Sequence, residues 1–295
     1  MITTSFTGHR TISKAKAYFE LLKFRLSALV TFSSAIGYGL ASYSGFQWSN
    51  FLMFCLGGFL VSGASVTINQ VMEQDYDGLM ERTRNRPLPT HRLSGNEALS
   101  FALAIGLVGL SIISLFANPI AGVLSLVSLV LYCFVYTPLK RVGPIAVFVG
   151  AIPGALPPLL GWVAVTGSIS HEALILFGIQ FIWQFPHFWA IAWIADDDYK
   201  RAGFKLLPSG GGRDLNTAIQ IMVYTLFLLP LGLLPSFFGI TGMGSAFVAT
   251  LCGVLFLSQT FLLMKDCSKK SAMKIMFGSF LYLPIVQIAY LLDKI

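Results

Sequence analysis

Charged residues are scarce in this sequence. Asp, Glu, Lys and Arg together make up only 11% of its 295 residues, whereas soluble domains carry about 25% because that fraction keeps a surface wet. Hydrophobic residues reach 55%, and the mean hydropathy is +0.74. This composition excludes a soluble enzyme and a disordered scaffold, and it argues against a nucleic-acid partner despite an isoelectric point near 9.3. The sequence therefore predicts an integral membrane protein.

Cysteine is also rare, and its spacing forms no motif. Three of the four cysteines, Cys55, Cys133 and Cys252, fall within long apolar segments, and Cys267 follows another such segment. No pair has the CxxC spacing of a metal or redox site. Neither a disulfide framework nor a thiolate metal site is expected.

Long apolar segments, by contrast, fill most of the chain. A helix needs about 20 apolar residues to cross the hydrocarbon core of a bilayer. The segments lack the alternating pattern of a membrane β-barrel, so they are expected to be helices. They predict an all-α, single-domain protein (residues 1–295) with nine transmembrane helices: Leu26–Tyr43, Phe51–Met72, Ala98–Phe116, Ile120–Tyr136, Ile145–Val165, Ala173–Ala195, Leu215–Phe238, Met243–Met264 and Ala272–Leu292.

The basic residues orient this predicted bundle. Lys and Arg favour the cytoplasmic loops next to membrane spans. If the N-terminus is cytoplasmic, every Lys and Arg except Lys294 falls on the cytoplasmic side. The pattern predicts a cytoplasmic N-terminal segment (1–23) and two loops on the same side (73–96 and 195–214). We expect these two loops to be the catalytic ones and the membrane to be the cell inner membrane.

Three residues with oxygen-bearing side chains lie four positions apart around the end of the second predicted span. They are Asn69, Glu73 and Asp77. If the helix continues, they lie on one face, within about 80° of each other. Such a set suits a hard divalent cation, and Mg²⁺ commonly bridges carboxylates to substrate phosphates. The alternative, a solvated acidic helix end, does not account for Asn69, which still lies in the apolar span.

Basic residues follow these acids directly. Arg82 and Arg86 lie within nine residues of Asp77, and guanidinium groups match phosphate geometry in a bidentate manner. Tyr136 and Lys140, one helical turn apart at the end of the fourth span, offer a further basic contact at the same membrane face. Together these residues predict a diphosphate site; the alternative is an anchor for anionic lipid headgroups.

A second acidic cluster leaves the sixth span. It is a run of three Asp that ends at Asp198, and basic residues again follow it, beginning with Lys200. The two clusters lie four spans apart, which suggests a loose internal repeat. Within the sixth span, Gln180, Gln184 and His187 share one face, and polar side chains at bilayer depth usually face a pocket or pathway. For His187 the alternative is a packing role.

These groups suit one kind of chemistry. Mg²⁺ and guanidinium groups neutralise the charge that grows on a leaving diphosphate. A bundle lined with apolar and aromatic side chains keeps the resulting allylic cation away from water. The expected substrates are an isoprenyl diphosphate and an electron-rich acceptor, both at home in membrane lipid.

Five segments carry a resemblance to a known family. The chain resembles the UbiA-type intramembrane prenyltransferases, which are similar nine-helix bundles with two Asp-rich cytoplasmic motifs. Within that family it is most similar to the branch that farnesylates haem. The matching segments are Asn69–Asp77, Met80–Leu88, Tyr136–Arg141, Pro186–Trp189 and Asp198–Pro208.

The resemblance implies a reaction and a site. Farnesyl diphosphate would ionise, a vinyl group of haem b would attack the cation, and water would add, which makes haem O for a terminal oxidase or a haem A synthase. The resemblance implies one set of catalytic residues that hold Mg²⁺ and another set of residues that bind the two substrates. The first set is Asn69, Glu73, Asp77 and Asp198; the second is Arg82, Arg86, Tyr136, Lys140, Gln184, His187 and Lys200.

The chain departs from the family pattern in three places, the least important being Lys23-Phe-Arg25, where the family usually has Lys-Pro-Arg. Glu73 stands where most members carry Asp, although it remains an oxygen ligand. Ile194 stands where the second motif has its first Asp, so Asp196 and Asp197 are candidates to replace that ligand.

Two other functions are compatible with the motifs. One is a UbiA-type enzyme that prenylates a quinone precursor or a chlorin. The other is a non-catalytic haem or lipid carrier, which is expected to expose polar residues to both sides of the membrane. Here the ionisable residues gather on one side, with Glu172 and Asp293 isolated on the other, which favours a one-sided enzyme.

Overall fold

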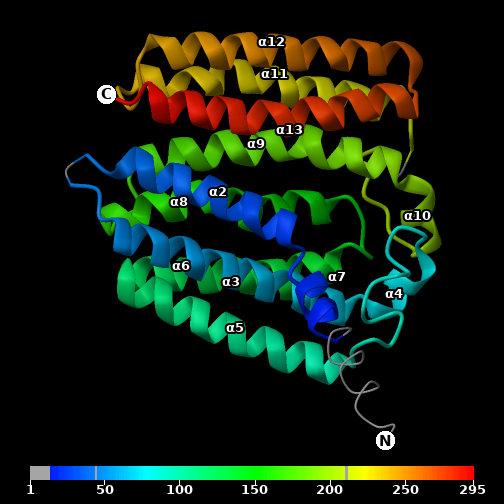
Figure 1. Ribbon diagram of the computed structural model, residues 1–295. Coiled ribbons are helices and arrows are strands. Elements are labelled where there is room, and N and C mark those ends of the chain that lie inside the picture. Colours follow the sequence, from blue (N-terminus) through cyan, green and yellow to red (C-terminus); the bar gives the residue numbers. More distant parts are fainter. Residues whose placement is uncertain (1–13, 44, 210–211) are drawn as a thin grey trace, which may run out of the picture.

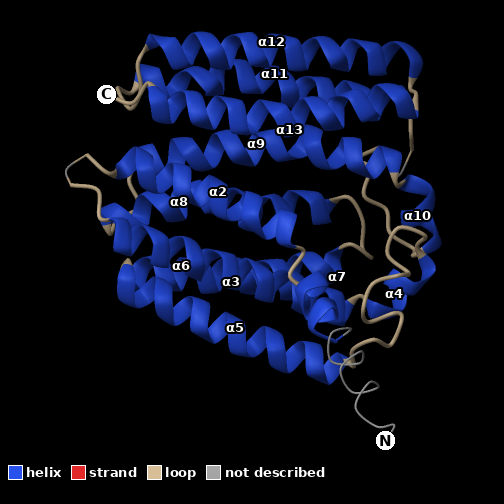
Figure 2. Ribbon diagram, viewed as in Figure 1, coloured by secondary structure: helices blue, strands red, loops and turns tan. Residues whose placement is uncertain are grey.

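The computed structural model describes residues 14–43, 45–209 and 212–295. Within these ranges the chain is helical, with no strand beyond one isolated bridge between Thr241 and Lys294 (Figure 2). The helices are α2 (Phe24–Ala41), α3 (Trp48–Met72), α4 (Gln74–Leu79), α5 (Gly95–Phe116), α6 (Pro119–Val130) with its continuation η1 (Leu131–Tyr136) and α7 (Thr137–Leu139), α8 (Ile145–Thr166), α9 (His171–Ile194), α10 (Asp196–Arg201), α11 (Leu215–Phe237), α12 (Met243–Asp266) and α13 (Lys269–Leu292).

Eight helical segments of the described ranges are long and apolar enough to cross a membrane, with α6 to α7 counted as one. The prediction of an all-helical, multi-pass membrane protein is therefore confirmed. All nine predicted segments coincide with helices to within three residues at each end. The segment outside the eight is α2, which is only 18 residues long and less apolar because it contains Arg25 and three serines.

The two predicted catalytic loops are partly helical, which corrects their description as loops. Each begins with one residue that leaves the helical conformation, Glu73 (φ −107°, ψ 9°) and Ala195 (φ −93°, ψ 10°), and then forms a six-residue helix, α4 or α10. The two acidic motifs thus share the same backbone form, as an internal repeat requires. Residues 1–13 of the predicted N-terminal segment lie outside the described ranges.

The long helices pack side by side in a fixed order (Figure 1). Helix α9 lies between the group α11, α12 and α13 and the helix α8, and α2, α3, α6 and α5 continue the bundle beyond α8. Small residues allow the closest contacts. A side chain at Gly57 of α3 would lie 2.9 Å from the carbonyl oxygen of Gly109 in α5, and one at Gly161 of α8 would overlap the backbone of Ser34 in α2.

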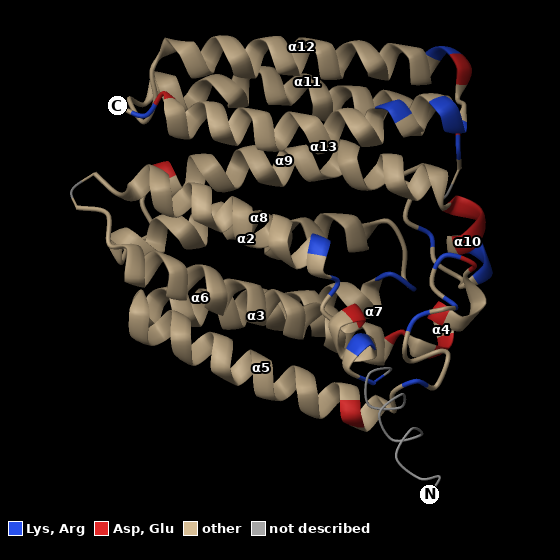
Figure 3. Ribbon diagram, in the orientation of Figure 1, with Lys and Arg blue, Asp and Glu red and all other residues tan. Residues whose placement is uncertain are grey.

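Charge is concentrated at one end of this bundle (Figure 3). Both short helices, α4 and α10, lie at that end, whereas the C-terminus lies at the other (Figure 1). There the Lys294 ammonium donates to the carbonyl oxygens of Gly39 (3.0 Å) and Ser42 (2.7 Å). The packing therefore brings the polar segments that follow α3, α7 and α9 to one end of the bundle.

Candidate active site

Asn69, Glu73 and Asp77 remain on one face although α3 ends between them. The Glu73 amide donates to the Asn69 carbonyl oxygen (3.0 Å), and the Asp77 amide donates to that of Glu73 (2.8 Å). The four-residue helical register thus continues through the break. The side chains are buried: the three residues are 2%, 5% and 1% exposed.

Each of the two acids forms an ion pair with a basic side chain that the sequence analysis predicts to bind diphosphate. Arg86 donates through Nη1 to both carboxylate oxygens of Asp77, at 2.8 and 2.7 Å. The Lys140 ammonium lies 2.9 Å from Oε1 and 3.1 Å from Oε2 of Glu73. Burying an unpaired charge is costly, and close pairing offsets that cost. The contact between the end of α3 and α7 therefore brings Lys140 to Glu73, whereas Arg86 reaches Asp77 from the loop that follows α4.

Tyr136 and Lys140 meet as their spacing predicts. The Lys140 ammonium lies 4.7 Å from the centre of the Tyr136 ring, and the ring packs on Gly150, where any side chain would overlap it. Burial, the largest single effect, lowers the pKa of Lys140, but the charge and hydrogen bond of Glu73 together with Tyr132 and Tyr199 raise the pKa above its usual value. Lys140 is therefore a permanent cation in this site.

The residues present fit a divalent cation of the Mg²⁺ type. Asn69, Glu73 and Asp77 supply buried oxygen atoms, and Oε1 of Glu73 accepts no hydrogen bond of good geometry despite its ion pair. Mg²⁺ usually takes one or two carboxylates and fills its shell with water and substrate phosphate. No group of three or more His, Cys, Asp or Glu is arranged to hold a metal within the described residues.

Asp198 lies at the rim of this site and holds a loop there. Its carboxylate accepts hydrogen bonds from the backbone amides of Glu81 and Arg82, both at 3.3 Å, and from Arg201 at 3.1 Å. The Arg82 guanidinium packs against the Tyr199 ring, 5.7 Å from its centre. The structure therefore places Asp198 beside Arg82, which follows Asp77 closely in the chain, but neither residue takes part in the ion pair between Asp77 and Arg86.

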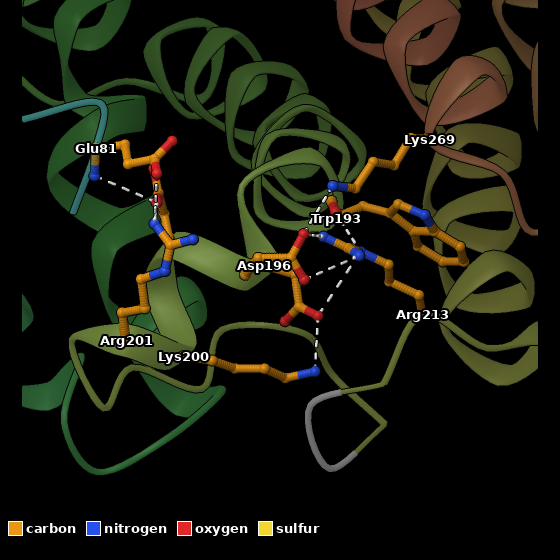
Figure 4. A network of polar contacts seen from close by, with 9 residues as sticks. Glu81, Trp193, Asp196, Lys200, Arg201, Arg213 and Lys269 are labelled. Carbon is orange, nitrogen blue, oxygen red and sulfur yellow. Dashed lines mark hydrogen bonds and ion pairs between the residues drawn. The ribbon is translucent and has the colours of Figure 1, made fainter.

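Lys200 and the candidate replacements for the missing acid belong to a separate network (Figure 4). Lys200, which is exposed, pairs with the buried carboxylate of Asp196 (2.8 Å). Arg213 contacts Asp197 (3.0 Å) and the Trp193 carbonyl oxygen (2.7 Å). Hydrogen bonds from Lys269 and Arg213 lower the pKa of Asp197 to about 2. This network connects α10 to α11 and α13, so its acids are already engaged.

The polar residues of α9 face two different neighbours. Gln184 donates to the Ala151 carbonyl oxygen of α8 (3.0 Å). His187 instead faces α13, where its Nδ1 lies 2.8 Å from Ser279 Oγ and its ring stacks on Trp183 with a centroid distance of 4.6 Å. Gln180 contacts both neighbours, through Gly154 and Gln287. The shared face that the sequence predicts is thus divided between two helix interfaces.

Lys23 is a site residue that the motif analysis did not single out. It is partly buried at the start of α2, in the left-handed conformation (φ 44°). Burial, and then the charges of Arg86 and Lys140, lower its pKa to about 7, while Asp77 and Glu73 act in the opposite direction. Two signals were present in the sequence: a lysine beside a membrane span, which topology explains equally well, and the string Lys23-Phe-Arg25, which stands where the family usually has Lys-Pro-Arg.

Comparison with known proteins identifies the family. Residues 29–283 match the UbiA prenyltransferase family, and the chain belongs to it. Curated relatives carry the name protoheme IX farnesyltransferase. The relative from Cytophaga hutchinsonii is 53% identical over 283 residues (96% of this chain, 99% of the relative), and that from Christiangramia forsetii is 44% identical over 280 residues (93% and 92%).

Solved structures have the same fold. A structure described in work on digeranylgeranylglyceryl phosphate synthase superposes with a TM-score of 0.78 at 22% identity, over 95% of this chain and 98% of the other. A UbiA homolog from Archaeoglobus fulgidus, bound to GPP and Mg²⁺, superposes with a TM-score of 0.66 at 16% identity (93% and 99%).

Proposed function

We propose that this protein transfers a farnesyl group from farnesyl diphosphate to a vinyl group of haem b, with addition of water and release of diphosphate, and so makes haem O. The observation that carries this proposal is the 53% identity to a protein named protoheme IX farnesyltransferase. That match covers 96% of the chain and therefore includes the buried acidic and basic site. The prenyl-transfer part rests also on the paired chemistry of that site.

The buried acids and their basic partners act on the diphosphate. Asn69, Glu73 and Asp77 would hold Mg²⁺, which would supply charge neutralisation for the departing diphosphate. Arg86 and Lys140 turn from the carboxylates to the phosphate oxygens and stabilise the same charge. In the unliganded site the acids already hold these cations in place, so little reorganisation is needed.

Residues at the rim extend this site. Arg82 adds a guanidinium on the cytoplasmic side of the diphosphate, and Lys200 adds a more distant positive charge. Asp198 would be the ligand that α10 contributes to the cation; in the structure its carboxylate accepts hydrogen bonds from the amides of Glu81 and Arg82. Tyr136 supports Lys140 through its ring.

The acceptor reacts inside the bundle. The terminal carbon of a haem vinyl group forms a bond to C1 of the farnesyl cation, water adds to the other vinyl carbon, and that water loses a proton. Gln184 and His187 are the residues that we assign to haem binding. Haem b titrated into a His187→Leu variant tests this placement: a shifted Soret band supports a contact with haem, and an unchanged band with unchanged affinity leaves His187 as a packing residue.

We further infer that the single domain crosses the inner membrane nine times, with the N-terminus and the active site on the cytoplasmic side. The charged end of the bundle supports this orientation (Figure 3), since basic residues mark the cytoplasmic face. In sealed inverted vesicles, where that face is outside, added farnesyl diphosphate should be consumed at once. In right-side-out vesicles it should be consumed only after the membrane is opened; equal consumption in both would contradict the orientation.

Mass spectrometry of extracted haem tests the reaction directly. Purified protein in detergent, given haem b, farnesyl diphosphate and Mg²⁺, should yield haem with the added mass of farnesyl plus water, and omission of Mg²⁺ should abolish the gain. Unchanged haem, together with prenylation of a hydroxybenzoate, naphthoate or chlorin, would show that the acceptor substrate is one of these compounds and not haem b. Unchanged haem and intact farnesyl diphosphate under all conditions would remove the enzyme proposal.

Lys23 makes the binding of diphosphate depend on pH. Its pKa is about 7 instead of 10.5, so above pH 7 the free protein holds Lys23 largely as the neutral amine. A bound diphosphate favours the ammonium, and binding should therefore take up a proton and weaken as the pH rises above 7. Calorimetry at pH 8 in two buffers of different ionisation enthalpy measures this uptake. A Lys23→Met variant should lose it; uptake of the same size in that variant would contradict the assignment.

A further inference from the structure

The segment that follows α6 does not keep the ordinary helical register. Its first turn, η1 (Leu131–Tyr136), is π-helical, and the short helix α7 that follows begins with Thr137 and Pro138. Single π-helical turns are rare and occur often at functional sites. Because of this register, both the backbone N–H and the side-chain hydroxyl of Thr137 donate to the carbonyl oxygen of Tyr132, five residues earlier, the hydroxyl at 2.9 Å.

Thr137 in turn contacts Asn69 of the acidic motif. Nδ2 of Asn69 donates to Oγ1 of Thr137 at 3.0 Å, and both residues are 2% exposed. The Thr137 hydroxyl hydrogen is already committed to Tyr132, so its oxygen can only accept. The branch of the Asn69 amide that faces Thr137 must therefore be the NH₂ group, and the amide oxygen is held on the other branch.

This orientation decides what Asn69 can bind. An asparagine amide rotated by 180° exchanges its oxygen for an NH₂ group, which repels a cation instead of coordinating it. No hydrogen bond among the described residues uses Oδ1 of Asn69, and the residue shares its helix face with Glu73 and Asp77. The Thr137 contact thus leaves one oxygen lone-pair donor available beside the two carboxylates.

We propose that Thr137 is a positioning residue for the divalent cation: it fixes the Asn69 amide so that its oxygen faces the cation. The proposal rests on the proposed function, because the cation is the one that reaction uses. Groups that orient a metal ligand from behind typically contribute 10- to 100-fold to metal affinity. The π-helical turn contributes to this role, because it directs the Thr137 hydroxyl hydrogen to the Tyr132 carbonyl oxygen and away from Asn69.

Metal binding measured without turnover tests this role. Purified full-length protein is titrated with Mn²⁺ at a fixed concentration of inorganic diphosphate, and free Mn²⁺ is followed by its EPR signal. Thr137→Val keeps the shape and removes the hydroxyl, and should weaken Mn²⁺ binding roughly 10-fold or more. Thr137→Ser keeps the hydroxyl and should bind Mn²⁺ about as the unmutated protein does.

A second background separates orientation from simple distortion. In Asn69→Asp both terminal atoms are oxygens, so rotation of the group no longer matters. Adding Thr137→Val to that variant should leave Mn²⁺ affinity nearly unchanged. An equal loss in both backgrounds, full affinity in Thr137→Val, or a Ser variant as weak as the Val variant would each overturn the proposal. Absence of Mn²⁺ binding in the unmutated protein would instead overturn the metal site of the proposed function, and this inference with it.

Discussion

Replacing Asp77 by Asn should lower kcat by roughly 10²- to 10³-fold, the scale of losing one preorganised charge-stabilising group. Asp77 is 1% exposed, and its two oxygens are both engaged by Arg86. The amide keeps the shape and one acceptor oxygen but removes the charge that holds the cation. The Mg²⁺ concentration for half-maximal rate should therefore rise together with the fall in kcat, as measured by the haem mass assay at increasing Mg²⁺.

Asp75→Asn is the matched control. Asp75 lies on the same short helix, two residues away, but it is exposed, and the same chemical change there should leave the rate nearly unchanged. Both variants should insert in the membrane and elute as the unmutated protein does. A normal rate in well-folded Asp77→Asn would show that the metal site is wrongly assigned.

Removing Arg86 should have the second largest effect, on both stability and catalysis. Arg86→Gln leaves the buried carboxylate of Asp77 without its partner, and breaking a buried ion pair in this way costs about 3–5 kcal/mol. It also removes a guanidinium from the diphosphate, so kcat/KM for farnesyl diphosphate should fall by roughly 10²-fold. Thermal unfolding in detergent measures the first effect, and initial rates measure the second.

The double variant distinguishes the two roles of Arg86. Asp77→Asn combined with Arg86→Gln removes both charges, so much of the lost stability should return while activity stays absent. Arg84→Gln serves as the control, because Arg84 is exposed in the same loop and should change neither quantity by much. If Arg86→Gln were as stable and as active as Arg84→Gln, the ion pair with Asp77 would have no role in the site.

The pairing of acids with bases explains how so many charges lie at the end of an apolar bundle. Glu73 and Asp77 are nearly inaccessible to water, yet each carries its own cation within 3 Å. A diphosphate with Mg²⁺ brings a matching set of opposite charges, so the exchange of partners changes the net charge of the buried site little. The site is thereby stable when free and suited to a highly charged substrate.

The sequence by itself determined the features that depend on neighbours along the chain. Helix positions follow from runs of apolar residues, because a backbone in lipid must satisfy its hydrogen bonds locally. The shared face of Asn69, Glu73 and Asp77 follows from four-residue spacing, and it survives the break at Glu73 because the hydrogen-bond register continues. Family membership followed from strings of adjacent residues around these positions.

Only the tertiary structure decided which faces meet, because that depends on how separate helices pack and on no local rule. It paired Glu73 with Lys140, sixty-seven positions later, and placed Lys23 among the charges of the site. It also turned His187 toward α13 and Gln184 toward α8, and engaged Asp198 with the loop at Glu81. The contact of Thr137 with Asn69 arose in the same way, from a π-helical turn on one helix that meets the end of another.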